Sequence, residues 1–339
     1  MNPSKRNGVL CYAASLLALL CGPLMAATDC AFTNSGSTMS LDADCTTDET
    51  IYVPDGWTLD GGGHSITAVD PDGDHFRGAV VANEGAAAHV TSLVVQTSGL
   101  ANACDGGDDR LRGILFEGAS GSITQNTVQN INQGASGCQE GNAIEVRNAP
   151  FDGTHPNTVA VDIEHNVVET YQKTGVVCNG DADCTLRFNF VGESATQANL
   201  AANSIQYGFG ATGVIEHNHV AGNQWLGASD YSASAVLLYE ADGTVLQKNN
   251  IGGNSDVGVY LLSDGAVVDN NRIFDGGPDG NQTGYDIGLG DWGTGNTITN
   301  NKIRGFDDPT NADGQHVISG AAPNPVCFGT GPGCGEVAE

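Results

Sequence analysis

One short pattern occurs seven times between Ile123 and Ile303: an aliphatic residue, any two residues, Asn, any residue, and then Val or Ile. The Asn residues of the seven copies are Asn126, Asn166, Asn189, Asn218, Asn249, Asn271 and Asn301. An eighth copy starts at Val90 and has Leu93 in place of the Asn. Successive copies start 22 to 40 residues apart, and such a short, variable period is typical of coils stacked on one another. The pattern therefore predicts a solenoid of about eight or more coils.

Aliphatic and polar residues alternate on both sides of each Asn, as they do in half-buried strands. The Asn interrupts the alternation and predicts a bend, for which we expect the Asn itself to adopt the left-handed backbone conformation that it tolerates. Its side chain carries two donors and an acceptor, so stacked Asn amides can bond to one another and to the main chain. Because a buried unpaired amide costs roughly 1–3 kcal/mol, we predict a continuous asparagine ladder that satisfies every member.

A second column of short strands precedes the Asn patterns. Each of these strands has a small or polar residue followed by an aliphatic residue, any residue and an apolar residue or Tyr. They are Gly113–Phe116, Ala143–Val146, Gly175–Cys178, Ser204–Tyr207, Ala235–Leu238, Gly258–Leu261 and Asp286–Leu289. Each coil is thus predicted to hold three short strands, each paired in parallel with its copy in the next coil. The predicted fold class is all-β, a parallel β-helix.

The segment Thr58–Ile66 reads TLDGGGHSI, which resembles the TLDGGGHTI opening coil common in the pectate-lyase-like superfamily of right-handed parallel β-helix repeat proteins. The resemblance covers about Ile51 to Phe306 and is specific for the fold, not for an activity. It implies a right-handed coil. It also implies that a substrate lies across the second column of strands, walled by the long loops that follow each Asn pattern.

The N-terminus has the pattern of a secretory signal peptide. Lys5 and Arg6 precede an apolar run from Val9 to Leu20, which is too short to span a bilayer, and Ala26 and Ala27 are small residues suited to cleavage. No other segment resembles a membrane span. We therefore expect a secreted or periplasmic protein with no membrane insertion.

The expected domains are a signal peptide at 1–27, a β-helix at 28–308, and a Gly- and Pro-rich tail at 309–339 that caps the last coil. Nothing in the sequence indicates an oligomer, and we expect a monomer.

Eight cysteines remain after the signal peptide, and an even number in an exported protein favours disulfides. Pairing nearest neighbours predicts Cys30–Cys45, Cys104–Cys138, Cys178–Cys184 and Cys327–Cys334. Zinc is the alternative, but none of these spacings is a C-x-x-C pair.

The formal net charge of −28 excludes a nucleic-acid partner, because no basic stripe offsets it. The same charge repels polyuronates unless bound calcium reverses the local potential. Calcium is the one cofactor that the sequence suggests. Asp70, Asp72 and Asp74 alternate beside Gly73, as in loops that bind hard cations, although a simple turn between coils would use the same residues.

The outward positions of the second column carry the candidate chemistry. One outward row is Leu115, Glu145, Val177, Gln206, Leu237, Tyr260 and Gly288, and the next is Glu117, Arg147, Asn179, Gly208 and Tyr239. The resemblance implies lyases that need a cation and a proton acceptor, or hydrolases that need one protonated and one ionised carboxyl.

We therefore interpret four residues as catalytic candidates and five as substrate-binding candidates. The catalytic candidates are Glu145, Arg147, Lys173 and Tyr239, and the substrate-binding candidates are Arg112, Glu117, Gln206, Trp225 and Tyr231. Alternatively, Glu145, Arg147 and Lys173 form only an exposed ion-pair cluster, and Trp225 and Tyr231 only pack their loop against the rod.

Two functions follow from this interpretation. The first is a secreted polysaccharide lyase or glycoside hydrolase that acts on an extracellular polysaccharide. The second is a non-catalytic extracellular β-helix that binds glycans or other surfaces by shape.

Overall fold

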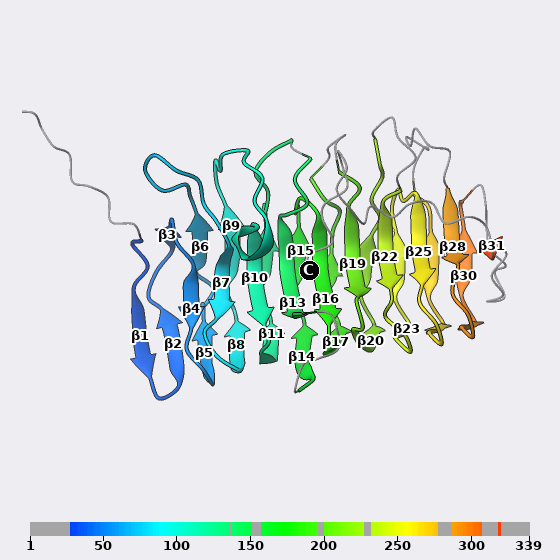
Figure 1. The fold of residues 1–339 in the computed structure, drawn as a ribbon, viewed down its shortest axis with the longest axis horizontal. Coiled ribbons are helices and arrows are strands. Elements are labelled where there is room, and N and C mark those ends of the chain that lie inside the picture. The colour runs from blue at the N-terminus through cyan, green and yellow to red at the C-terminus, as the bar shows by residue number, and fades with distance from the viewer. Residues whose placement is uncertain are drawn as a thin grey trace, which may run out of the picture.

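The computed structural model describes residues 28–135, 137–150, 157–195, 200–226, 232–276, 286–306 and the short strand at 318–319. The predicted signal peptide, Tyr231, Cys327, Cys334 and nearly all of the predicted capping tail lie outside these residues. The described chain forms a rod of stacked coils (Figure 1). No helix in the described residues is long and apolar enough to cross a membrane.

Three sheets run along the rod, and we call them sheets A, B and C. Successive coils add one strand to each sheet in the chain order C, B, A. The strands of sheet B are β1 (Phe32–Ser35), β2 (Thr38–Leu41), β5 (Trp57–Asp60), β8 (Ala87–Thr91), β11 (Ser120–Thr124), β14 (Val159–Glu164), β17 (Ala182–Arg187), β20 (Thr212–Glu216), β23 (Val245–Gln247), β26 (Val267–Asp269) and β29 (Thr297–Thr299).

Sheets A and C contain the other strands of the coil. Sheet A consists of β3 (Cys45–Thr47), β6 (Ser65–Ala68), β9 (Val94–Thr97), β12 (Thr127–Gln129), β15 (Val167–Glu169), β18 (Phe190–Val191), β21 (His219–Ala221), β24 (Asn250–Gly252), β27 (Arg272–Phe274) and β30 (Lys302–Arg304). Sheet C consists of β4 (Ile51–Val53), β7 (Ala79–Asn83), β10 (Arg112–Glu117), β13 (Asn142–Asn148), β16 (Thr174–Gly180), β19 (Asn203–Gly208), β22 (Ser234–Tyr239), β25 (Val257–Leu262), β28 (Ile287–Asp291) and β31 (Ile318–Ser319).

The core is the interior of the coil, and it is built from columns of like residues. The aliphatic residues that precede the ladder, from Ile123 on β11 to Ile298 on β29, stack in register in sheet B. Those that follow the ladder, from Val128 to Ile303, stack in sheet A. All of these side chains are buried in one continuous hydrophobic cluster. Parallel pairing of identical positions thus makes each coil a template for the next.

The predicted asparagine ladder is confirmed. Each ladder Asn accepts, on its side-chain oxygen, hydrogen bonds of 2.9–3.1 Å from the backbone N–H of the equivalent residue in the preceding coil and, where that residue is Asn, from its side-chain amide. The amide of Asn218 also donates to the carbonyl of Leu186. Leu93 lies at the start of the column, and its backbone N–H donates to Asn126.

The predicted conformation of the ladder residue is wrong in one respect. The left-handed residue at each bend is the one before the Asn, as at Gln125 (φ 59°), His165 (φ 57°) and Phe188 (φ 58°). This arrangement places the bend before the Asn and leaves the Asn side chain pointing into the coil, where its amide reaches the neighbouring Asn residues. The ladder bonds offset the backbone strain that a non-glycine residue incurs in this region.

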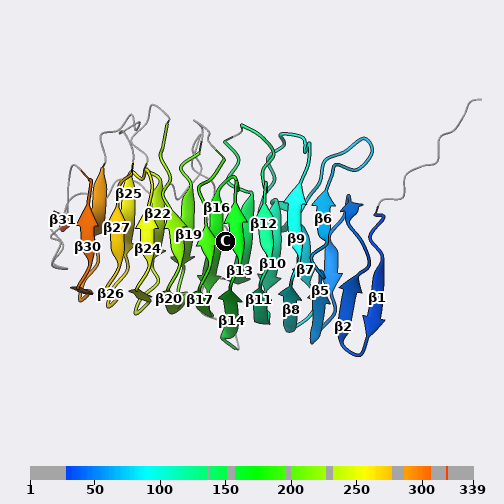
Figure 2. The ribbon, with the colours of Figure 1, turned by 180° about the vertical axis from the view of Figure 1, so that it is seen from behind.

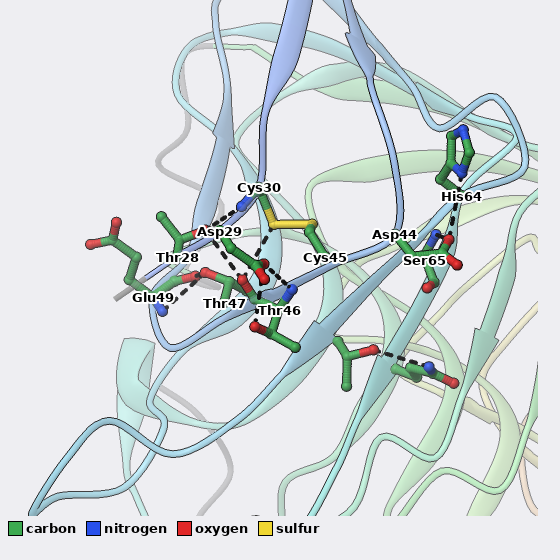
Figure 3. The surroundings of a disulfide bond; sticks show 12 residues. Thr28, Asp29, Cys30, Asp44, Cys45, Thr46, Thr47, Glu49, His64 and Ser65 are labelled. Carbon is green, nitrogen blue, oxygen red and sulfur yellow. Dashed lines mark hydrogen bonds and ion pairs between the residues drawn. A yellow bond between two sulfur atoms is a disulfide. The ribbon is translucent and has the colours of Figure 1, made fainter. Parts of the chain in front are cut away.

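The N-terminal end of the rod is closed by a hairpin and a disulfide. Strand β1 pairs with β2 and is antiparallel, unlike the pairings along the rest of the rod. The confirmed disulfide Cys30–Cys45 ties the segment before β1 to β3, and the side chain of Asp29 accepts a hydrogen bond from the backbone N–H of Thr46 (Figure 3). Covering the end of the coil in this way removes an edge that could pair with other chains.

Replacing Asn218 by Ala should lower the free energy of unfolding by about 2–5 kcal/mol, because several buried ladder groups around it lose their partners, each at about 1–3 kcal/mol. Asn250→Ala is the matched control, since Asn250 is not a ladder residue and lies on an outward position. Urea unfolding midpoints measure both effects. Equal losses in the two variants would contradict the proposed contribution of the ladder.

Candidate functional site

The strands of sheet C carry the residues that we predicted to form the site. The register confirms both outward rows over most of their length: Leu115, Glu145, Val177, Gln206, Leu237 and Tyr260 are successive neighbours, as are Glu117, Arg147, Asn179, Gly208 and Tyr239. The prediction for the last position of the first row, Gly288, is wrong. Tyr260 lies opposite Gly290, not Gly288, because β28 is displaced by two residues from the expected alignment.

Most of the first row is closed off from solvent, and Leu115 is half-buried. Glu145 is 4% exposed, Gln206 is 9% exposed, and Val177, Leu237 and Tyr260 are buried. Loops that lead from sheet A to sheet C leave the rod along one edge (upper edge in Figure 1), and residues in one of them contact the side chains of Arg112 and Arg147 in sheet C. The expected open face is therefore partly covered, which the strand pattern alone did not indicate.

Arg112 and Glu145 form an ion pair beneath this cover. Nε of Arg112 donates to Oε2 of Glu145 at 2.7 Å, and the side chains are 1% and 5% exposed. Asn142 donates to the same oxygen at 2.8 Å. Burial alone would raise the pKa of Glu145, but Arg112, Asn142 and Arg147 outweigh it, so the pKa is lowered and the carboxylate stays charged.

The guanidinium of Arg112 also organises the loop in front of β10. Its two Nη atoms donate to the carbonyls of Gly107, Asp108 and Arg110 at 3.0–3.3 Å. Gly107–Asp109 forms the 3₁₀ turn η1 within this loop. Arg112 and Glu145 are thus positioning residues in this structure, since they hold a loop and are closed off from solvent.

Two further contacts fasten the same loop. The carboxylate of Glu140 accepts the backbone N–H groups of Asp105 and Leu111 at 3.0 and 2.8 Å. The confirmed disulfide Cys104–Cys138 joins the loop to the corresponding loop of the next coil. The disulfide Cys178–Cys184, also confirmed, lies further along and links β16 to β17.

The polar groups nearest to solvent surround Arg147. Nε of Arg147 lies 2.8 Å from Oε2 of Glu117, without the alignment of a hydrogen bond, and Nη1 lies 3.8 Å from Oδ1 of Asp108. The Glu117 side chain is 37% exposed and that of Asp108 is 95% exposed, whereas that of Arg147 is 4% exposed. Two accessible carboxylates therefore flank one guanidinium.

The environment of Glu117 favours its protonated form. Burial raises its pKa, and the nearby carboxylates of Glu145 and Asp108 raise it further. Arg147 and the backbone N–H of Ala149 act in the opposite direction but do not cancel the effect. Glu117 and Glu145 thus have pKa values displaced in opposite directions, a common arrangement in acid–base sites.

Lys173 does not join this cluster. Its Nζ donates to the carbonyl of Ala201 at 2.6 Å, and burial lowers its pKa to about 8. Among the described residues, no carboxylate forms an ion pair with it. The alternative of an exposed cluster of Glu145, Arg147 and Lys173 is therefore not what the structure shows.

The remaining predicted residues are dispersed along the rod. Tyr239 is three strands from Arg147 in the same row, about 14 Å at the usual strand spacing, and its ring contacts Phe209. Gln206 donates to Asn179 at 3.4 Å. Trp225 is 4% exposed and packs with Ala201 and Ala233, so it could stack on a sugar only if its loop moved.

The three predicted calcium ligands do not converge. Asp70 accepts the backbone N–H groups of Phe76 and Ala101, while Asp74 pairs with Arg77 through two hydrogen bonds of 2.9 Å. The bonds to Arg77 hold the pKa of Asp74 at about 2. The carboxylates of Asp70, Asp72 and Asp74 are not among the described groups whose ligand atoms lie within 4.8 Å of one another. Calcium binding here stays a prediction.

With this geometry established, comparison with known proteins settles the fold. A family model described as the right-handed β-helix region matches residues 154–320. The chain is a right-handed parallel β-helix repeat protein. No curated protein matches it. Among solved structures, the crystal structure of Dettilon tailspike protein matches with 12% sequence identity and a TM-score of 0.42. The match covers 78% of this chain and 55% of the tailspike chain, so this chain spans about half the length of the tailspike.

Asp108 is the group in the cluster that sequence reasoning missed. It lies in a loop with several acidic residues, and no strand pattern indicates where that loop folds. The only signal is indirect: Arg112 is one of few cations in the β-helix and starts the strand that follows the loop.

Replacing Arg112 by Met should destabilise the protein by about 3–5 kcal/mol, because it leaves the charge of Glu145 buried without its partner. Arg187→Met is the matched control. It removes a more exposed cross-strand pair with Glu164 (2.6 Å) and should cost at most about 1 kcal/mol. Denaturant unfolding compares the two variants, and similar values would show that burial does not set the importance of the Arg112 pair.

Proposed function

We propose that this β-helix is an exported carbohydrate-active protein that hydrolyses an extracellular polysaccharide, with Glu117 as the proton donor. The observation that carries the proposal is the arrangement around Arg147, where two solvent-accessible carboxylates flank one guanidinium and one of them has a raised pKa. Glycoside hydrolysis by two carboxyl groups requires one that is protonated and one that is ionised.

The two carboxyl groups are assigned distinct roles. Glu117 has the raised pKa, so of the two it is the carboxyl better suited to carry a proton to the leaving oxygen. Asp108 is the exposed carboxylate beside Arg147 and would act as the base or nucleophile. Glu145 is charged but closed off, so it contributes by holding the loop of Asp108 through Arg112.

Elimination chemistry has less support. A lyase needs a cation free to neutralise a substrate carboxylate and a base free to take a proton. The Nζ of Lys173 is engaged by the carbonyl of Ala201, and the charge of Arg147 is shared by Glu117 and Asp108. Export is supported by the three disulfides in the described chain, which persist in oxidising compartments.

Glu117→Gln should reduce polysaccharide cleavage by about 10²–10⁴-fold, because the amide cannot donate the proton. The measurement is release of reducing ends from a panel of neutral and acidic polysaccharides, with absorbance of unsaturated uronates followed in parallel. Glu84→Gln is the matched control, since Glu84 is exposed and lies in the turn after β7, beside the coil of Glu117.

The panel separates the alternatives. Cleavage that yields unsaturated uronates and survives Glu117→Gln would overturn the hydrolase in favour of a lyase. Binding without cleavage on the whole panel would overturn catalysis in favour of a glycan-binding β-helix.

The pH profile tests the assigned proton. If Glu117 must be protonated, kcat/KM falls as the pH rises through its pKa. Arg147 lowers that pKa, so Arg147→Met should move the alkaline limb to higher pH, while Arg147→Lys, which keeps the positive charge, should leave it nearly in place. If the alkaline limb of the pH profile does not move in Arg147→Met, a group other than Glu117 determines the pH at which activity is lost.

A further inference from the structure

The outer face of sheet A carries a second column of residues that the proposed function does not use. The residue after each ladder Asn points outward, because it precedes the buried aliphatic residue of the same strand. Successive members lie directly opposite one another along the sheet, and they are Thr127, Val167, Phe190, His219, Asn250, Arg272 and Lys302. Toward the C-terminal end the column passes from apolar Val167 and Phe190 through polar His219 and Asn250 to the two basic residues.

The middle of the column borders a shallow groove. Phe190 lies at one end of the groove and is 45% exposed. At the other end, the ring of Phe274 lies so close to Gly252 that a β-carbon added to this glycine would be 2.2 Å from the ring. His219 and Asn250 line the groove between them, and its volume is about 160 Å³. The groove thus has aromatic rings at both ends and polar groups between them.

The groove continues into a second hollow, which is lined by basic side chains. Arg272, Lys302 and Arg304 line a hollow of about 430 Å³ that shares Phe274 with the first groove. Figure 2 shows β24, β27 and β30 side by side near one end of the rod. Arg272 lies on β27, and Lys302 and Arg304 lie on β30. All three cations are exposed, and within the described part of the chain no carboxylate lies within 4 Å of them.

This clustering of cations has a cost in stability. Arg272 lies directly opposite Lys302, and like charges in that relation destabilise a sheet. The chain has only 12 Lys and Arg residues against 40 Asp and Glu, so carboxylates to neutralise the pair are plentiful in the sequence. An anion bound across the two strands would remove the repulsion.

From these observations we infer that the outer face of sheet A is a second ligand site, which binds an extended anionic glycan. The basic groups bind acidic substituents of the sugar chain, and Phe190 and Phe274 stack against the apolar faces of its rings. From Phe190 to Lys302 the site covers four strand spacings, about 19 Å, so it takes several sugar units. The site lies on a different sheet from Glu117 and does not depend on the function proposed there.

A glycan fits this face better than a nucleic acid does. The net charge of −28 repels a polymer with a charge on every unit, and three cations on two strands cannot offset it along a continuous phosphate backbone. A sugar chain with spaced acidic groups can place them at the basic hollow and its uncharged faces on the aromatic groove.

The test is affinity electrophoresis of the Glu117→Gln protein in gels that contain partly methyl-esterified polygalacturonate, its fully methyl-esterified form or a neutral β-glucan. Using this variant separates binding from cleavage, so a failure here does not bear on the hydrolase. We expect the partly esterified polymer, whose acidic groups are spaced along the chain, to retard the protein more than the other two polymers do. The triple variant Arg272→Ser, Lys302→Ser, Arg304→Ser should weaken that binding roughly tenfold, since it removes three charge-assisted contacts.

A matched triple variant controls for net charge. Arg77→Ser, Arg187→Ser and Lys248→Ser remove the same charge at exposed positions that do not line either groove, and they should change the affinity less than about twofold, because exposed charges without a direct contact to the ligand are screened by salt. Phe190→Ser should weaken binding by about threefold or more if the ring stacks on sugar. Thermal melting verifies that each variant is folded.

Three results would overturn the inference. The first is the absence of retardation by partly methyl-esterified polygalacturonate. The second is an equal loss in both triple variants, which would show that only net charge matters. The third is equal or tighter binding of single-stranded DNA in the same gels, which would make the face a general polyanion site.

Discussion

The hydrogen bonding of stacked asparagine side chains is the interaction on which this structure depends. At each bend between sheets B and A the chain leaves one sheet before it enters the next. The backbone N–H and C=O groups of the bend are then not paired within a sheet and need other hydrogen-bond partners. The carboxamides supply them, and each one bonds to the Asn of the next coil. Because a ladder residue cannot move by one position without losing these bonds, the ladder also holds the three sheets in register.

That register turns single residues into columns. Ile163, Asn166 and Val168 lie over the equivalent residues of the next coil. An outward-pointing residue therefore also lies beside the outward-pointing residue at the equivalent position of the next coil. Both candidate sites arise in this way. Glu117 and Arg147 are neighbours on sheet C although they are far apart in the sequence, and the basic hollow forms on sheet A by the same pairing.

The two faces differ because of where the long loops lie. The bend that contains the ladder is short, whereas most of the connections from sheet A to sheet C are longer, and one of them folds over the strands of sheet C. The cover is stabilised from below by a buried ion pair, Arg112 with Glu145, which would be costly to break once formed. Sheet C therefore offers a few accessible groups at the margin of a loop, while sheet A remains open.

The sequence by itself determined the coil, the ladder, three of the disulfides and nearly all of the strand register, since these depend on a pattern repeated many times. It did not determine which residue of the bend is left-handed, nor the last register on β28, where the repeat is weakest. The tertiary structure alone decided that Glu145 is buried while Glu117 and Asp108 are accessible. Loops have no period, and their path is set by contacts between distant residues, such as those of Arg112 with the carbonyls of its own loop.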